Sequence, residues 1–404
     1  MHFSKFFLVA AATLAAAHPG EVHDAHALKR EIRARDAYAV AAKRALDACA
    51  STTEAQQLNQ RNVARRARTA RQLRQNKGIT TNAHKWRRDL AALEKWEAIN
   101  HNKTDVLDYS ANTPESRIFG GNTSAILAPT ITDGPYYVWG EILRQNVREE
   151  KYCDGVDLTL EVQYIDVNTC RPVKGAVVDI WNANATGVYS GISTSGNYAA
   201  DGWDSTYLRG IQQTDDDGVV TFDTIFPGHY EGRATHTHLL THLNATMNAN
   251  GTLEVGTGSI AHIGQLFWNE VLRSAVEDTS PYNTNTQAIT TNADDMWSVL
   301  QASDEYDPFP EYLYLGEGLE DGLFAWIQIG INASADYTDN SYYSIAAYYQ
   351  EDGGHQNSAS SAFGGSGGDM NGTMPSGVAP SGAIPSGAMP SGAIPSGASS
   401  SSSA

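Results

Sequence analysis

The stretch RGIQQTDDDGVVTFDTIFPGHYEGRATHTH, residues 209–238, contains the residues that decide the expected fold and site. Its acidic run Asp215–Gly218 predicts a tight turn, a β-type run follows, and a Pro-Gly pair predicts a second turn. If the last residues are extended, His236 and His238 point to the same face of a strand. The stretch therefore predicts a hairpin that brings Tyr230 and two imidazoles to one place.

The pair His236-x-His238 is a candidate for metal binding, because two imidazoles on one face can ligate the same ion. Surface or core histidines give the same spacing, so the pair alone leaves both interpretations open. Tyr230 and Arg233 lie just upstream. A phenol, a guanidinium and two imidazoles so close together are unusual in a solvated loop, and they favour a metal site.

A second stretch, GAVVDIWNANATGVYS at residues 175–190, has the pattern of a buried strand, a turn and a tyrosine, Tyr189. Together the two stretches resemble the two signatures of the intradiol ring-cleaving dioxygenases, in the same order along the chain. The resemblance covers roughly residues 126–270. It implies a β-sandwich that holds a metal between loops and strand ends.

The resemblance also implies a metal centre with protein ligands from both stretches. By position in the two signatures, the ligands are Tyr189, Tyr230, His236 and His238. Hard phenolate oxygens favour a hard, high-valence ion, and the family implies non-haem Fe(III), although ligand type alone leaves copper open. The partners would be a small aromatic diol and O2.

The family's chemistry implies that a catechol is cleaved between its two hydroxylated carbons to give a muconate-type diacid. Tyr230 would leave the metal and accept a proton, Arg233 would stabilise negative charge on the ring, and Gln265 would assist Arg233. Tyr136 or Tyr137 would line the substrate pocket. The structural alternatives are a surface salt bridge for Arg233 and aromatic packing at the domain edge for the two tyrosines.

Short β runs separated by turns predict an all-β core, an antiparallel β-sandwich. The expected organisation is a signal peptide at residues 1–17, a basic helical segment at 18–100, an intradiol dioxygenase-like β-sandwich domain at 101–352 and a low-complexity tail at 353–404. The Ser, Gly and Pro of the tail cannot build a packed core, so the tail is expected to be disordered.

The segment 18–100 is dominated by Ala, Arg, Gln, Leu and Lys, which predicts helices. Its dibasic pairs, Arg65-Arg66 among them, are compatible with a propeptide that is cut in the secretory pathway. Apolar residues between positions 90 and 99 recur at helical spacing and favour an arm that stays on the core. The family resemblance implies N-terminal helices that join subunits, so a homodimer is also possible on these grounds.

The charge is unevenly divided: residues 1–100 carry a net charge of +9, and the remaining residues carry −27. An acidic main body argues against nucleic acid as a partner, because phosphates would be repelled. Met1–Ala17 has the pattern of a secretory signal, and no other run of 18 apolar residues predicts a membrane span. Seven Asn-x-Ser/Thr sequons support a secreted, glycosylated protein.

The chain has three cysteines. Cys153 and Cys170 flank the predicted strand 156–167, and secretion would permit a disulfide between them. Cys49 is then left over, in the segment whose removal is one of the interpretations.

Two other functions remain open from the residues alone. His238 and His242 have the i, i+4 spacing that holds zinc on a helix in hydrolases, although the glutamate that serves as base is missing. His236-x-His238 with a third histidine would also suit zinc on strands. A secreted carbohydrate- or wall-binding module without catalysis would also fit a sandwich that ends in a Ser/Pro-rich tail.

Overall fold

A computed structural model of the chain describes residues 25–79, 99, 101–103, 118–119, 124–125, 131–149, 151–194, 196–254, 256–302, 307–340, 343–350 and 352–357. The chain divides into two units, Met1–Gly364 and Gly365–Ala404, and every described residue lies in the first. The predicted signal peptide, and the predicted tail from residue 358 onward, lie outside the described residues.

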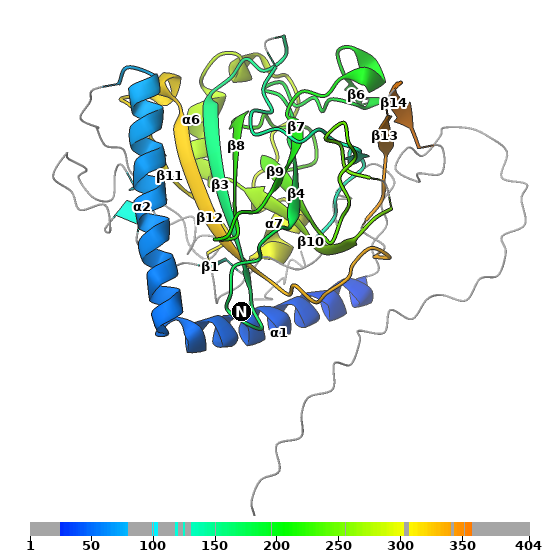
Figure 1. Ribbon diagram of the computed structural model, residues 1–404. Coiled ribbons are helices and arrows are strands. Elements are labelled where there is room, and N and C mark those ends of the chain that lie inside the picture. The colour runs from blue at the N-terminus through cyan, green and yellow to red at the C-terminus, as the bar shows by residue number, and fades with distance from the viewer. Residues whose placement is uncertain are drawn as a thin grey trace, which may run out of the picture. The chain divides into compact units, whose positions relative to one another are not determined.

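The described strands form two larger and two smaller sheets (Figure 1). The five-stranded sheet contains β1 (Ser124–Ala125), β3 (Asp157–Asp166), β8 (Val219–Ile225), β11 (Glu311–Tyr314) and β12 (Leu323–Ile331). The four-stranded sheet contains β4 (Val177–Trp181), β7 (Arg209–Gln213), β9 (His236–Leu243) and β10 (Ser259–Phe267). The smaller sheets contain β2 (Val138–Trp139), β13 (Ala347–Gln350) and β14 (Gly353–Gln356), and β5 (Ser193–Thr194) and β6 (Asn197–Tyr198).

The prediction of a mostly β core with N-terminal helices is confirmed, but the expected purely antiparallel pairing is wrong. β12 pairs with β3 in parallel, and β1–β12 and β2–β13 are parallel as well. Parallel neighbours need a long crossover connection, and β3 and β12 are separated by most of the domain. Alternating apolar residues show that a segment is a strand, but they carry no information about the direction of its neighbour.

One apolar core joins the two larger sheets. Leu160 of β3 and Phe222 of β8 belong to the same buried cluster as Ile180 of β4, Leu239 of β9 and Leu266 of β10, and each is fully buried. Burying an aliphatic or aromatic side chain of this size stabilises the fold by about 1.5–3 kcal/mol. The core therefore fixes the four-stranded sheet, whose strand ends carry the site, against the five-stranded one.

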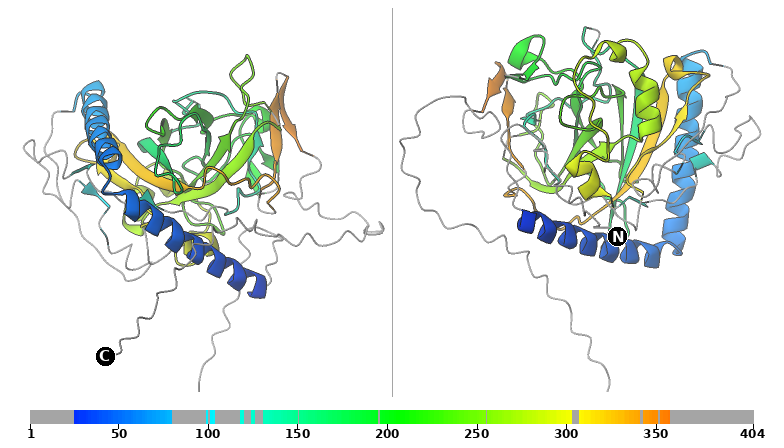
Figure 2. Two further views of the ribbon diagram at one scale, coloured as in Figure 1. Left: turned by 60° about the horizontal axis from the view of Figure 1, so that its bottom comes forward. Right: turned by 180° about the vertical axis from the view of Figure 1, so that it is seen from behind.

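Two long helices, α1 (Ala25–Cys49) and α2 (Thr53–Asn76), confirm the helical prediction for this part of the chain (Figures 1 and 2). Thr52 caps α2, because its side chain accepts a hydrogen bond of 3.2 Å from the Ala55 N–H. The remaining helical elements are η1 (Gly202–Asp204), α6 (Glu270–Glu277), η2 (Tyr282–Thr284), α7 (Met296–Gln301) and η3 (Leu319–Asp321). No described helix is long and apolar enough to cross a membrane.

The two helices pack on the β domain rather than standing apart from it. On α2, Ala67 and Ala70 belong to a buried cluster with Phe324 and Trp326 of β12. On α1, Ala39 joins the apolar core that the two larger sheets share. These contacts favour an arm that stays on the core.

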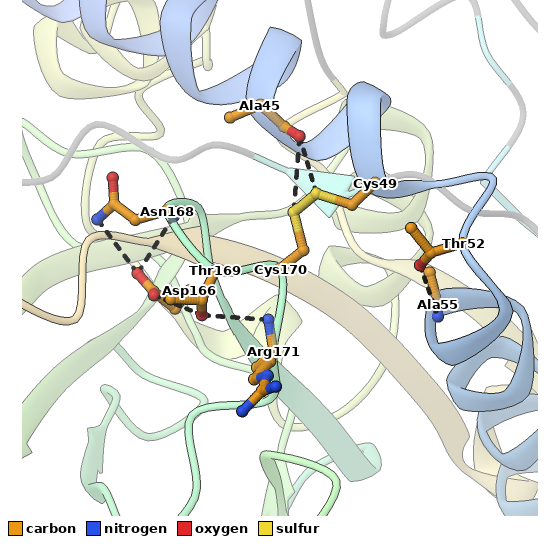
Figure 3. Close-up of a disulfide and its surroundings, with 9 residues drawn as sticks. All are labelled: Ala45, Cys49, Thr52, Ala55, Asp166, Asn168, Thr169, Cys170 and Arg171. Atoms are coloured by element: carbon orange, nitrogen blue, oxygen red, sulfur yellow. Dashed lines mark hydrogen bonds between the residues drawn. A yellow bond between two sulfur atoms is a disulfide. The ribbon is translucent and has the colours of Figure 1, made fainter. Parts of the chain in front are cut away.

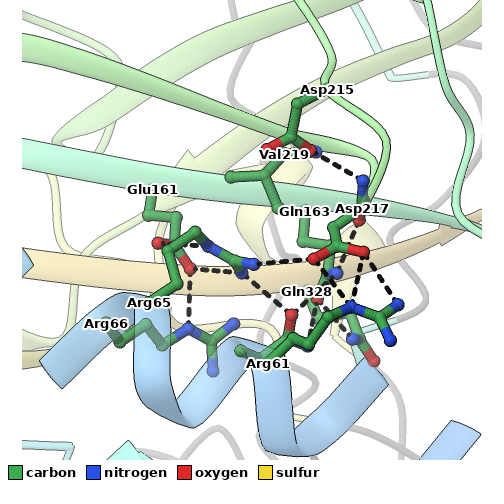
Figure 4. A network of polar contacts seen from close by, with 10 residues as sticks. Arg61, Arg65, Arg66, Glu161, Gln163, Asp215, Asp217, Val219 and Gln328 are labelled. Atoms are coloured by element: carbon green, nitrogen blue, oxygen red, sulfur yellow. Dashed lines mark hydrogen bonds and ion pairs between the residues drawn. The ribbon is translucent and has the colours of Figure 1, made fainter. Parts of the chain in front are cut away.

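Charge pairs reinforce the contact between α2 and the five-stranded sheet (Figure 4). Glu161 on β3 is 1% exposed and accepts hydrogen bonds from Arg65, at 3.0 Å, and from Arg66, at 2.7 Å. Next to it, the amides of Asn62 and Gln163 bond to each other in both directions. The positive charge of the N-terminal segment is therefore matched to acidic and polar side chains of the sheet.

The disulfide joins Cys49, at the end of α1, to Cys170, in the turn after β3 (Figure 3). The predicted Cys153–Cys170 bond is wrong, and Cys153 is a free, half-buried thiol. β3 has ten residues and so is about 33 Å long, which keeps the cysteines at its two ends far beyond bonding range. The Cα atoms of Cys49 and Cys170 lie 6.3 Å apart, within that range.

Replacing Cys49 by serine is expected to lower the free energy of unfolding by about 2–4 kcal/mol, because the unfolded chain loses a long-range cross-link. Cys153→Ser is the matched control and should change stability little. A non-reducing peptide map of the unmodified protein should show the Cys49 and Cys170 peptides linked and Cys153 open to alkylation. A map with Cys153 in a disulfide would contradict this pairing.

The core domain extends beyond the predicted boundary at residue 352. Residues Gly353–Gln356 form β14, which pairs with β13, and the described part of the chain continues to residue 357. The first residues assigned to the tail are therefore part of a sheet.

Candidate metal centre

The strand β9 aligns the two histidines as the sequence predicts. β9 begins at His236, so His236 and His238 share one face, and both are buried. His238 lies between Trp181 of β4 and Gln265 of β10 in the register of the sheet. The indole of Trp181 stacks on the His238 ring at 4.6 Å between centroids and 6° between planes, which fixes the ring's orientation.

Two turns bring the tyrosines to these histidines. Tyr189 follows the turn after β4. In this turn, the side-chain oxygen Oδ1 of Asn184 accepts hydrogen bonds of 3.0 Å from the Thr186 and Val188 N–H groups. Tyr230 follows the Pro-Gly turn after β8. The two turns pack backbone to backbone, because Gly187 lies directly against the carbonyl of His229.

Gly187→Ala is expected to lower the free energy of unfolding by more than Gly196→Ala. Both glycines have positive φ, 79° and 88°, so each substitution costs about 1–2 kcal/mol of backbone strain. A Cβ at Gly187 would also collide with the His229 carbonyl, whereas Gly196 has open space around it. Overpacking of this kind adds about 1–3 kcal/mol. Equal unfolding free energies of the two variants in denaturant would show that the turns do not touch.

All four predicted ligands converge on one point. The Tyr189 and Tyr230 hydroxyl oxygens each lie 3.4 Å from His236 Nε2, and His236 Nε2 lies 2.9 Å from His238 Nε2. The His236 Nδ1 lies 2.6 Å from the Ala234 carbonyl oxygen. The nitrogen that faces the carbonyl carries the proton, so the neutral ring presents the Nε2 lone pair to the other three side chains.

The chemistry of these donors fits a hard, highly charged cation. Burial raises the pKa of both Tyr189 and Tyr230 above the ordinary value of a phenol, and the charge of Arg233 opposes that rise. Ionising two buried phenols next to each other requires a nearby positive charge, which a bound trivalent ion supplies. Two phenolates and two imidazoles match such an ion better than a softer one.

The helical form of the zinc alternative loses its geometric basis. His238 and His242 both lie on the strand β9, not on a helix, and His242 points to Asp179 and Tyr137. Within the described part of the chain, no group of three or more His, Cys, Asp or Glu side chains could hold a metal ion.

Arg233 is fully buried and belongs to a connected set of side chains, so the surface salt-bridge interpretation is wrong. Its Nε donates to Asp295 Oδ2 at 2.8 Å, and its Nη2 donates to Gln265 Oε1. The amide of Gln265 in turn donates to the Thr132 carbonyl at 2.7 Å. Arg233 and Gln265 are thus paired as the sequence predicts.

Asp295 is the residue of this site that the sequence analysis missed. Besides Arg233 Nε, it accepts a hydrogen bond of 2.8 Å from the Ala234 N–H. It also caps α7, because its side chain accepts from the Trp297 and Ser298 N–H groups. An Asp before an apolar run is a recognisable helix cap, but nothing in the sequence connects that cap with Arg233.

The structure separates the two candidate pocket tyrosines. The half-buried Tyr136 ring lies 4.9 Å from the Tyr189 ring and 6.1 Å from the Tyr230 ring, between centroids. Tyr137 is fully buried and its hydroxyl donates to Asp179 Oδ2 at 2.9 Å. Tyr136 is therefore the one that borders the centre, and Tyr137 faces the interior.

Part of the chain is similar to known proteins. Residues 132–270 match a protein-family model described as "Dioxygenase". An intradiol ring-cleavage dioxygenase from Tetranychus urticae is 30% identical, over 53% of this chain and 97% of that protein, with a TM-score of 0.43. No curated protein matches the chain.

Two more distant solved structures are also similar. The catechol 1,2-dioxygenase of Acinetobacter sp. ADP1 is 18% identical, over 54% of this chain and 65% of that one, with a TM-score of 0.32. The hydroxyquinol 1,2-dioxygenase of Pseudomonas putida DLL-E4 is 18% identical, over 52% of this chain and 68% of that one, with a TM-score of 0.32.

Proposed function

Because the chain belongs to the intradiol ring-cleavage dioxygenases, we propose that it is a secreted non-haem Fe(III) enzyme that cleaves catechol-type rings between the two hydroxylated carbons. The observation that carries the proposal is the convergence of Tyr189, Tyr230, His236 and His238 on one point. These four side chains would hold the ion. When bound, it would supply a Lewis acid that holds the diol oxygens and promotes reaction of the ring with O2.

Tyr230 is the proposed proton acceptor. It is only half-buried, whereas Tyr189 is 1% exposed, so the Tyr230 oxygen has more room to move when a diol arrives. The proton would pass from a diol hydroxyl to Tyr230 Oη. The half-buried Tyr136, against both tyrosine rings, would form one wall for the aromatic substrate.

Arg233 would stabilise the negative charge that develops on the ring. The guanidinium is dry and held in place by Asp295 and Gln265, so it needs no reorganisation during the reaction. A fixed charge in such an environment is worth far more than in water. Cleavage between the hydroxylated carbons would give a muconate-type diacid.

Secretion is a further part of the proposal. The signal-like pattern of residues 1–17, the sequons and the Cys49–Cys170 disulfide all support an oxidising compartment. The contacts of α1 and α2 support a β-sandwich domain that keeps this helical arm. A homodimer through the same helices stays a prediction. Recovery of the glycosylated protein from the culture medium of a secreting host would test the localisation.

The test of the activity is a visible spectrum of the iron-reconstituted protein, taken without oxygen before and after catechol is added. A broad ferric-phenolate band that moves to longer wavelength is expected, followed by ring-opened diacid when oxygen is admitted. Tyr230→Phe should alter the band, whereas Tyr198→Phe, at a position that is 70% exposed, should not. A protein that stays colourless after reconstitution would overturn the proposal.

A further inference from the structure

A buried polar cluster lies behind the proposed ligands. It consists of Tyr137, Glu141, Asp179, Arg209 and His242, none of them more than 4% exposed. Three of its members stand on strands of the four-stranded sheet, β4, β7 and β9. The proposed mechanism uses none of these residues. Burying this many ionisable groups destabilises the fold unless they are paired and hydrogen-bonded to one another.

Arg209 connects the two segments that form the aromatic wall of the centre. Its Nη2 donates to the Tyr136 carbonyl at 2.7 Å and to the Ser190 carbonyl at 2.8 Å. Its Nε donates to Ser190 Oγ at 3.0 Å. One guanidinium therefore joins the backbone of the candidate pocket residue to the residue that directly follows the Tyr189 ligand.

The anchor of this connection is the sheet itself. Arg209 is the first residue of β7 and pairs with Trp181 of β4, and Trp181 also stacks on His238. Asn197 holds the Tyr189 backbone too, with its Oδ1 accepting from the Tyr189 N–H at 2.7 Å, but it belongs to the same loop. The hydrogen bonds of Arg209 thus hold the segment that follows Tyr189 in a fixed position relative to the sheet.

The cluster contains two carboxyl groups, those of Glu141 and Asp179, and one arginine. Glu141 Oε1 accepts from Arg209 Nη1 at 3.1 Å, and burial raises the pKa of both the Glu141 and the Asp179 carboxyl groups. The oxygens Glu141 Oε2 and Asp179 Oδ1 are buried and accept from no N–H or O–H of the described residues. A single guanidinium balances the charge of only one buried carboxylate, so one of the two carboxyl groups carries a proton.

The surroundings assign that proton to Glu141. Asp179 Oδ2 accepts from the Tyr137 hydroxyl at 2.9 Å and faces His242 Nε2 at 3.2 Å. Burial lowers the pKa of His242 to about 3, so its ring is neutral and can donate a single N–H toward Asp179. Asp179 thus has several donors around it and is the carboxylate, while Glu141 is the acid.

We propose that Arg209 is a positioning residue that fixes the Tyr189 segment against Tyr136, with its charge balanced by Asp179 through a protonated Glu141. We call the hydrogen bonds from Arg209 to Tyr136 and Ser190 the clamp. Its effect on metal binding by Tyr189 rests on the proposed function, but the clamp itself does not. A cluster with one positive and one negative charge is neutral overall, which is the arrangement that a buried site tolerates best.

The clamp is tested by hydrogen–deuterium exchange on the full chain. Arg209→Lys keeps the charge but loses the planar fork, so peptides that cover residues 189–198 should exchange at least roughly tenfold faster. Arg273→Lys is the matched control, since Arg273 is a buried, ion-paired arginine on α6, and it should leave this segment unchanged. Unchanged exchange in Arg209→Lys would overturn the positioning role.

In iron-loaded protein, the same Arg209→Lys variant should shift the ferric-phenolate band, because the Tyr189 oxygen would be less well fixed. The two failures are distinguishable. A wild-type protein without the band would refute the proposed function, whereas faster exchange in the variant would still support the clamp. A normal band and normal exchange in the variant would refute the clamp alone.

The shared proton is tested independently by infrared spectroscopy. The unmodified protein should show C=O stretches of protonated carboxyl groups near neutral pH. Glu141→Gln should remove one component, while the buried Asp133, whose pKa burial also raises, keeps its own. An amide at this position can still accept from Arg209, so the variant should fold and exchange normally. In Asp179→Asn, Glu141 should give up its proton and pair directly with Arg209 as a carboxylate, so its C=O stretch should be lost there as well. An unchanged carboxyl-acid spectrum in Glu141→Gln would overturn the assignment.

Discussion

Replacing Asp295 by asparagine is expected to lower the free energy of unfolding by about 3–5 kcal/mol, the usual result of breaking a buried ion pair. Arg233 and Asp295 are both completely buried, so removing the carboxylate leaves an uncompensated charge inside the protein. Turnover of catechol should fall by about 10²–10³-fold, because Arg233 would no longer be held where the ring acquires negative charge.

Asparagine is the right replacement because it keeps the helix cap. The Asp295 Oδ1 accepts from the Trp297 and Ser298 N–H groups, and an amide oxygen can do the same. Asp294→Asn is the matched control, since that neighbouring side chain is exposed. Denaturant unfolding and oxygen uptake measure the two effects. Equal unfolding free energies and equal rates of oxygen uptake in the two variants would mean that the Arg233–Asp295 pair neither stabilises the fold nor orients the guanidinium.

Replacing Glu161 by glutamine is also expected to cost about 3–5 kcal/mol of unfolding free energy, because two arginines of α2 lose their buried counter-charge. Arg66 is 3% exposed and its Nε lies 2.7 Å from Glu161 Oε1, while Arg65 forms a second ion pair with the same carboxylate. The matched control is Asp217→Asn. Asp217 pairs closely with the exposed Arg61, and the Arg65 guanidinium lies 3.7 Å away, so this change should cost no more than about 1 kcal/mol.

The comparison of Glu161→Gln and Asp217→Asn also decides the fate of the N-terminal helices. A protease cannot readily use the Arg65-Arg66 pair of α2, since Arg66 is buried against β3 and both side chains are engaged by Glu161 of that strand. If α2 were nevertheless removed from the mature protein, Glu161 would have no arginines to pair with and Glu161→Gln would be nearly neutral. The intact mass of the secreted protein, under reducing and non-reducing conditions, gives a direct check.

Much of the candidate metal centre could be predicted from local sequence. The positions of His236 and His238 on one face follow from the two-residue repeat of a strand, and the turns before Tyr189 and Tyr230 follow from their Asn, Gly and Pro residues. The arm's helices follow in the same way from residues with high helix propensity. Each of these features depends on neighbours only a few positions away.

Only the tertiary structure decided which distant residues meet. The parallel pairing of β3 and β12, the Cys49–Cys170 disulfide and the contact of Asp295 with Arg233 all join residues far apart in the chain. Nothing at one position specifies its partner there, because the choice depends on where strand ends and turns come to lie once the core is packed. The sequence therefore determined the chemistry of the centre, and packing determined the groups that hold it in place.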